Sequence, residues 1–190
     1  MDVSRLKEVP LEYLASDRLR YEPLRREHFD QLLSVYQEKE VTRYLLSRPS
    51  GAADFAPIFE NSLDAAVHNG MWAVFAGAEL HLCGRVGFFE FSDARRPEIA
   101  FLFSAKYWGR GYATEACRTA LSWALPHHAW QECIALVRPT NRSALRVCSK
   151  LGMKHEYQVS LRGARVDVLR ATRRELGRYA AEQPDEPDGE

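Results

Sequence analysis

Residues 98–116 read EIAFLFSAKYWGRGYATEA and combine a strand, a short loop with two glycines and the start of a helix. Residues 98–103 are mostly large and apolar, and small residues after Gly109 recur along one stripe of a predicted helix that ends before Pro126. Glycines let successive N–H groups converge, and a helix start adds unpaired N–H groups and a positive dipole end. The segment therefore predicts a cradle for an anion such as pyrophosphate.

The two glycines by themselves leave a second interpretation open, in which they only relieve strain in a tight strand-to-helix connection. Thr114 stands where a Rossmann fingerprint has its third glycine, and no Gly-Lys-Ser/Thr follows as it does in a P-loop. Neither of these two nucleotide-binding motifs is therefore present.

The segments on either side of this stretch predict a single sheet flanked by helices. The order is strand, helices, three consecutive strands joined by tight turns, helix, strand, helix and a final hairpin. This order predicts an α/β (α+β) fold with one mixed, mostly antiparallel central sheet of about seven strands. The predicted strands are 18–23, 71–76, 80–91, 98–103, 133–137, 153–161 and 165–171, and the predicted helices are 26–36, 40–46, 53–69, 109–125 and 141–151.

Length and charge predict one soluble domain with a small anionic ligand. The chain has 190 residues, of which 46% are hydrophobic and 27% charged. We expect an N-terminal arm (1–16), one domain (17–180) and an acidic tail (181–190) that is disordered. The first 180 residues carry all 26 bases and 21 of the 26 acids, a net charge of +5. That excess suits a polyanionic small molecule, whereas the overall neutrality favours neither nucleic acid nor a membrane surface as a partner.

The cysteines and the N-terminus predict a cytoplasmic protein. No two of the four cysteines form a CxxC pair, and no histidine stands at metal-ligand spacing from them, so we expect buried reduced thiols and no metal. The first 17 residues contain four acids and no apolar core of a signal peptide. No apolar run approaches the ~18 residues of a membrane span.

Residues 107–116 resemble the acetyl-CoA-binding loop of the GNAT superfamily of N-acetyltransferases, whose pattern is Gln/Arg-x-x-Gly-x-Gly/Ala. Trp108 stands at the first position, Gly111 at the invariant glycine and Ala113 at the final small residue. Tryptophan departs from the general pattern but is usual in the RimJ/RimL-like branch, the ribosomal-protein-alanine acetyltransferases. Residues 17–20 and 141–153 also resemble that branch, and the resemblance covers roughly residues 17–175.

The resemblance implies a GNAT fold and a site for acetyl-CoA as co-substrate. The strand before the loop is expected to splay from its neighbour, so that Phe101 and Phe103 offer backbone groups to the pantetheine arm and to the acetyl carbonyl, including an oxyanion donor. Asn141 is expected to hydrogen-bond the cofactor, or to serve only as a helix N-cap. The pyrophosphate is expected to be held by Trp108, Gly109, Arg110, Gly111, Tyr112, Ala113 and Thr114.

The same resemblance suggests catalytic residues, each with a structural alternative. Glu98 begins the strand that faces the acetyl group, so it is expected to take a proton from the incoming ammonium, or to be only a solvated strand end. Cys148 stands where many relatives carry a tyrosine that protonates the leaving thiolate. We expect Cys148 to be a core residue instead, with water or Ser143 as the proton source.

Four basic residues gather on the expected cofactor side. They are expected to attract the 3′-phosphate, or to be only the solvated basic faces common on helices. These residues are Arg110, Arg142, Arg146 and Lys150.

The expected function is acetyl transfer from acetyl-CoA to a primary amine by direct attack in a ternary complex. The acceptor is either a protein N-terminus or a small-molecule amine, and the sequence does not distinguish the two. A catalytically silent acyl-CoA-binding or regulatory module is the alternative, because the tyrosine is missing. A homodimer is compatible with the sequence, which leaves the oligomeric state open.

Overall fold

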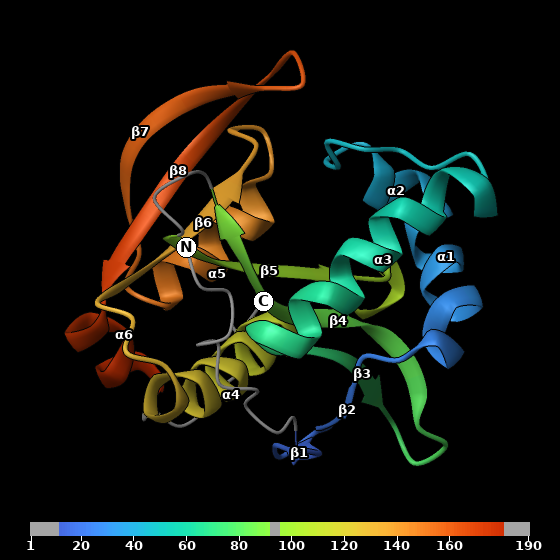
Figure 1. Ribbon diagram of the computed structural model, residues 1–190, viewed down its shortest axis with the longest axis horizontal. Coiled ribbons are helices and arrows are strands. Elements are labelled where there is room, and N and C mark those ends of the chain that lie inside the picture. Colours follow the sequence, from blue (N-terminus) through green and yellow to red (C-terminus); the bar gives the residue numbers. More distant parts are fainter. Residues whose placement is uncertain (1–11, 92–95, 181–190) are drawn as a thin grey trace, which may run out of the picture.

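The computed structural model describes residues 12–91 and 96–180. Within them, eight strands form one sheet in the order β1-β2-β3-β4-β5-β6-β8-β7 (Figure 1). Neighbouring strands run antiparallel except β5 and β6, which are parallel. The predicted mixed, mostly antiparallel sheet is therefore confirmed, with eight strands in place of about seven.

The elements follow the predicted order closely. The strands are β1 (Leu14–Ala15), β2 (Leu19–Pro23), β3 (Met71–Ala76), β4 (His81–Phe91), β5 (Arg96–Phe103), β6 (Glu132–Val137), β7 (Lys154–Leu161) and β8 (Ala164–Thr172). The helices are η2 (Arg26–His28), α1 (Phe29–Gln37), α2 (Lys39–Thr42), α3 (Ala52–His68), η3 (Ala105–Tyr107), α4 (Tyr112–His127), α5 (Arg142–Lys150) and α6 (Arg173–Ala180).

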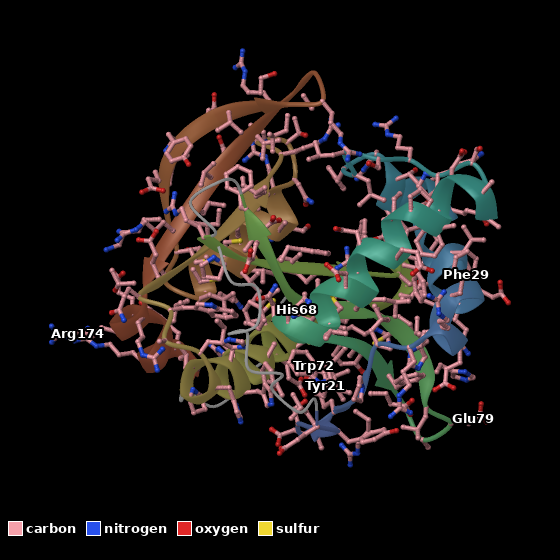
Figure 2. The ribbon with its side chains drawn as sticks, viewed as in Figure 1. Tyr21, Phe29, His68, Trp72, Glu79 and Arg174 are labelled. Atoms are coloured by element: carbon pink, nitrogen blue, oxygen red, sulfur yellow. The ribbon has the colours of Figure 1, made fainter. Side chains whose placement is uncertain are left out.

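Helices cover both faces of the sheet, so the central strands are apolar throughout. All six residues of β3 are buried, and successive side chains enter two different clusters because strand side chains alternate. Trp72 and Val74 pack with α4, α5 and α6, whereas Met71 and Phe75 pack with α1, α2 and α3. Figure 2 shows Trp72 and Tyr21 close together on the side that α4 covers.

Helix α4 differs from its predicted bounds at both ends. It begins at Tyr112 because Gly109 (φ 73°) and Gly111 (φ 75°) have left-handed backbones that a helix interior excludes. It continues to His127 and includes Pro126 in its last turn. Proline there removes a single N–H, and the N–H of His128 still reaches the carbonyl of Ala124 at 2.9 Å. The predicted stop at Pro126 was therefore wrong by two residues.

Three elements were not predicted from the sequence, namely β1, η3 and α6. The strand β1 has two residues, which pair Leu14 with Tyr21 and Ala15 with Arg20. Helix α6 follows β8 directly and buries Leu176 against α4. The expected acidic tail (181–190) and most of the expected arm (1–16) lie outside the described residues. Among the described helices, none combines the length and apolarity needed to cross a membrane.

Candidate functional site

Two cavities meet at the middle of the sheet. The loop cavity, about 320 Å³, lies among the end of β5, the glycine loop (residues 107–111), α2 and the first turns of α4 and α5. The α3 cavity, about 1030 Å³, lies among one side of α3, residues 46–49, strand β4 and the tip of the β7–β8 hairpin. Glu98 and Leu136 line both cavities, so the two spaces share one wall.

The glycine loop turns the chain so that the first N–H groups of α4 face the loop cavity. Gly111 is the N-cap of α4 and has a left-handed backbone, which glycine adopts without steric cost. Tyr112, Ala113 and Thr114 form the first turn and line the cavity. Their N–H groups lack helical partners, and the helix dipole adds positive potential there. This arrangement suits a phosphate group.

Trp108 fastens this loop to the end of β5. Its indole N–H donates to the carbonyl of Phe103 at 2.8 Å. The side chain is 36% exposed, and its ring lies 6.4 Å from that of Tyr44 beyond α2. Trp108 therefore fixes the position of Gly109 and Gly111 and also forms part of the cavity wall.

Strands β5 and β6 separate soon after they meet. Their register contains one pair, Glu98 with Ile134. Against β4, the N–H of Ser104 donates to the carbonyl of Cys83, and hydrogen-bonded positions alternate along an antiparallel pair. The backbone groups of Phe101 and Phe103 therefore face away from β4, toward the gap. Because Trp108 engages the carbonyl of Phe103, Phe101 is the better placed to offer both backbone groups to a ligand.

The start of α5 forms the opposite wall of the loop cavity. The side-chain oxygen of Asn141 accepts from the N–H of Ala144 at 3.1 Å, so the N-cap prediction is confirmed. Its amide nitrogen remains available to a ligand, since Asn141 also lines the cavity together with Ser143. Of the four basic residues considered from the sequence, Arg146 and Lys150 belong to the described lining, and Arg110 and Arg142 lie outside it.

The sequence did not reveal a clamp between the start of β2 and the glycine loop. The Nε of Arg18 donates to Oε2 of Glu115 at 2.7 Å, and its Nη1 donates to the carbonyl of Arg110 at 2.8 Å. The backbone N–H of Arg18 and the hydroxyl of Ser16 both reach Oε1 of Glu115. Arg110 thus contributes its carbonyl to this clamp, while its guanidinium lies 5.9 Å from the Tyr107 ring centre.

Glu98 is the titratable group where the cavities meet. Its side chain is partly buried, and this burial raises the pKa of its carboxyl to about 7, against the weaker opposing effect of the Arg85 guanidinium. A carboxyl with a pKa near neutrality exchanges protons readily at physiological pH, which suits a general base.

The α3 cavity has charged groups of both signs on its walls. Helix α3 places Asp54, Asn61, Asp64 and His68 along one side at helical spacing, and Figure 2 shows His68 at the end of that helix. At the mouth, Arg162 on the hairpin tip donates to the hydroxyl of Ser47, which joins the hairpin to the connection between α2 and α3. This contact links segments 115 residues apart across one side of the cavity.

Cys148 lies in the core and not in either cavity. Its side chain has no exposed surface, and burial raises the pKa of its thiol to about 12. Neither a proton donor for a ligand nor a thiolate nucleophile is available at this position. The expectation of a core residue is confirmed.

One further group could hold a metal ion. Glu22, Glu27 and His28 place three ligand atoms within 4.8 Å of one another, apart from both cavities. The Nδ1 atom of His28 accepts from the N–H of Arg25 at 3.0 Å, so Nε2 carries the proton of the neutral ring and faces Glu22. This arrangement is a satisfied hydrogen-bond network and needs no ion.

Comparison with known proteins gives a family match over most of the chain. Residues 18–154 match the family model described as acetyltransferase (GNAT) domain. A stretch of 62 residues is 36% identical to Uncharacterized protein YkkB of Bacillus subtilis (strain 168) and covers 33% of this chain and 36% of that protein. Uncharacterized N-acetyltransferase p20 of Bacillus licheniformis is 23% identical over 168 residues, which cover 83% of this chain and 93% of that protein. The chain spans less than half the length of the first curated relatives it matches, 36% and 44%.

Solved structures share the fold at low sequence identity. A GNAT-family acetyltransferase from Bacillus anthracis superposes with a TM-score of 0.72 at 19% identity, covering 86% of this chain and 99% of that one. A spermidine N-acetyltransferase from Vibrio cholerae, solved with CoA and spermine, gives a TM-score of 0.69 at 15% identity, covering 85% and 99%.

Proposed function

Because the chain belongs to the GNAT family of acetyltransferases, we propose that it transfers an acetyl group from acetyl-CoA to a primary amine. The observation that carries this proposal is the shared wall at Glu98. One cavity ends in an anion cradle, the other is a large polar space, and the titratable carboxyl lies where they meet. Two reactants in these cavities would be adjacent at Glu98, so direct attack in a ternary complex needs no covalent enzyme intermediate.

The loop cavity supplies the groups that acetyl-CoA requires. The N–H groups from Tyr112 to Thr114 would bind the pyrophosphate, and Asn141 and Ser143 would contact the pantetheine arm from the start of α5. Backbone groups of Phe101 in the gap between β5 and β6 would pair with that arm and donate to the carbonyl oxygen as it gains charge.

Glu98 acts as the general base in this proposal. Amines are mostly protonated at neutral pH, so a proton must leave before the nitrogen can attack. A carboxyl with a pKa of about 7 is about half ionised at pH 7 and can take that proton directly or through water. The leaving thiolate would take its proton from water or from Ser143, since Cys148 is buried away from both cavities.

We also propose that the chain belongs to the RimJ/RimL-like branch. Trp108 supports this, because it occupies the first position of the loop motif and holds the loop to β5. The four buried free thiols suit a reducing compartment, and we propose the cytoplasm. The acceptor is a peptide N-terminus or a small-molecule amine, and the α3 cavity is large enough to admit either.

Release of CoA from acetyl-CoA in the presence of a panel of free amines and peptides tests the proposal. We expect release with at least one acceptor, an acetylated product by mass spectrometry, and a rise in melting temperature with CoA alone. Amino-blocked versions of the same acceptors are the matched control. CoA binding without release on any amine would favour the silent binding module, and no CoA binding would overturn the assignment.

A further inference from the structure

Arg85 is a buried cation in the wall of the α3 cavity. Its residue is 9% exposed, and it lies on β4, covered by α1. Nε and Nη2 donate to the hydroxyl of Tyr36 at 3.0 and 2.7 Å, and Nη1 approaches the sulfur of Met71 at 3.5 Å. These partners are neutral, and the ion pairs within residues 12–91 and 96–180 do not include Arg85.

A buried charge without a close counter-ion is costly, because hydrogen bonds to neutral groups offset only part of its lost hydration. Here the guanidinium lines a cavity that a ligand would enter, so a ligand can supply the missing negative charge. Arginine suits this purpose, because its planar fork binds carboxylates with two parallel hydrogen bonds.

The acids of the same cavity are already engaged elsewhere. Asp54 accepts hydrogen bonds from the hydroxyl and the N–H of Ser50. Oδ1 of Asp64 lies 3.9 Å from Nε2 of His68. Glu90 also makes an interaction of its own. Glu98 is the remaining acid of the cavity, and the Arg85 guanidinium lowers its pKa less than burial raises it. Within residues 12–91 and 96–180, none of these carboxylates forms an ion pair with Arg85.

The position of Arg85 relative to Glu98 sets the length of the ligand. Phe89 pairs directly with Glu98 across β4 and β5, and Arg85 lies four residues before Phe89, about 13 Å along the strand. The guanidinium is 5.4 Å from the Phe89 ring centre, so the side chain extends toward Glu98. An amine at Glu98 and a carboxylate at Arg85 would therefore be separated by only a few bonds.

We propose that the acceptor is a free amino acid or a similar small zwitterion, whose carboxylate binds Arg85 while its amino group lies at Glu98. This inference rests on the proposed function, because it assigns the acceptor of that reaction. Arg48 and Arg162 at the mouth of the same cavity add positive charge that attracts an anionic group.

The wild-type protein tests this with matched acceptors. We would compare amino acids with their amides and with the corresponding decarboxylated amines, such as leucine, leucinamide and 3-methylbutylamine. We expect kcat/KM to be about ten- to a hundredfold higher for the acid, as for the loss of a charge-assisted hydrogen bond. Equal or faster reaction of the amide, whose amine is the more easily deprotonated, would overturn the inference.

The variant Arg85→Met tests whether Arg85 causes the preference for the acid over the amide. We expect the acid-to-amide ratio to fall to near one, because only the acid loses a partner. Removing Arg85 also alters Glu98, but that change slows all acceptors alike and cancels in the ratio. Arg20→Met is the control, since Arg20 is exposed on β2 and outside both cavities. An unchanged ratio in a folded Arg85→Met protein would overturn the assignment of Arg85.

Two further measurements distinguish this inference from the transfer reaction itself and from a carboxylate on the acyl donor. Calorimetry on the CoA-saturated protein should show binding of leucine and about tenfold weaker binding of leucinamide. Selective binding without turnover would keep the inference and overturn the transfer reaction, and unselective binding would overturn the inference. Succinyl-CoA replacing acetyl-CoA with simple amines tests whether the carboxylate belongs to the donor. A preference for succinyl-CoA would overturn the acceptor assignment.

Discussion

Arg18 and Glu115, 97 residues apart in the chain, form an ion pair at 2.6 Å that joins the first long strand to the first turn of α4. The Glu115 side chain is 6% exposed and the Arg18 side chain 43% exposed. A carboxylate buried beside the proposed phosphate cradle would repel a phosphate unless it were neutralised. The pair therefore keeps the positive potential of the helix start available to a ligand.

Replacing Arg18 by methionine should weaken both the fold and cofactor binding. The change leaves Glu115 buried without its cation, which we expect to cost about 1–2 kcal/mol, below the value for a fully buried pair because Arg18 is partly exposed. CoA affinity should fall about tenfold. Urea unfolding and calorimetry measure the two effects. The double variant Arg18→Met/Glu115→Gln should recover part of the lost stability and part of the lost CoA affinity. If the losses of the two single variants simply added in the double variant, Arg18 would not act by neutralising Glu115.

Gly109 and Gly77 make a matched pair for testing the loop. Both have left-handed backbones (φ 73° and 80°), and an added Cβ would meet nothing within 4 Å at either position. Alanine should therefore cost each about 1–2 kcal/mol in backbone strain. Only Gly109 lines the loop cavity, so only Gly109→Ala should lose CoA affinity, by at least about tenfold. Equal affinities in the two variants would make the loop purely structural.

Glu98→Gln should lower turnover by about 10²- to 10⁴-fold with little change in CoA affinity. Glutamine keeps the size of the side chain but lacks the basic oxygen. In the parent enzyme, the rate should rise with pH through about 7 as the carboxyl ionises. The deficit of the variant should shrink at higher pH, because more acceptor arrives deprotonated. Steady-state pH profiles of both proteins check this, and superimposable profiles would leave water as the base.

Glu98 should also affect the pH dependence of stability. Its pKa is about 7 in the folded protein and ordinarily about 4.5, so the folded state retains a proton that the unfolded chain releases. The contribution of this protonated carboxyl to the free energy of unfolding is fully present below pH 4.5 and is lost as the pH rises through 7. Glu98→Gln should therefore gain stability relative to the parent between pH 5 and 8. If the urea midpoints of the parent and of Glu98→Gln changed with pH by the same amount, the raised pKa of Glu98 would be contradicted.

Cys148→Ala should retain most of its activity, because the thiol lies in the core and its pKa of about 12 keeps it protonated. Removing one buried heavy atom should cost about 1 kcal/mol of stability. Intact-protein mass spectrometry after mixing the parent with acetyl-CoA alone should show no acetylated Cys148. A stable adduct at that residue, or loss of turnover in a folded variant, would argue for covalent catalysis.

The sequence predicted the order of elements because most of them have strong periodic patterns. The small-residue stripe of α4 has helical spacing, and the six apolar residues of β3 are too few for a helix and are bounded by Gly70 and Gly77. Helix α6 gave no such signal, since RRELGRYA has few apolar residues. It is held by long-range contacts: Arg173 donates to the carbonyl of Leu125 in the last turn of α4 and to those of His128 and Trp130 after it.

The glycine loop was predictable as a site because its residues are contiguous. Gly111, Ala113 and Asn141 line the loop cavity as the resemblance implied, although their contacts with a ligand stay predictions. Arg18 and Arg85 were not predictable. Arg18 lies just before β2 and Arg85 lies on β4, and a surface position is the common outcome for an arginine. Their partners, Glu115 and Tyr36, lie 97 and 49 residues away, and only the assembled sheet brings them together.

The common wall formed by Glu98 and Leu136 has a kinetic consequence. In the proposed reaction each reactant would occupy its own cavity, so binding of one would not require the other to leave. Double-reciprocal plots at several fixed concentrations of the second reactant should therefore intersect, as for a sequential mechanism. Parallel lines, the mark of a ping-pong scheme, would require a side chain that carries the acetyl group between the two half-reactions, and would contradict direct attack.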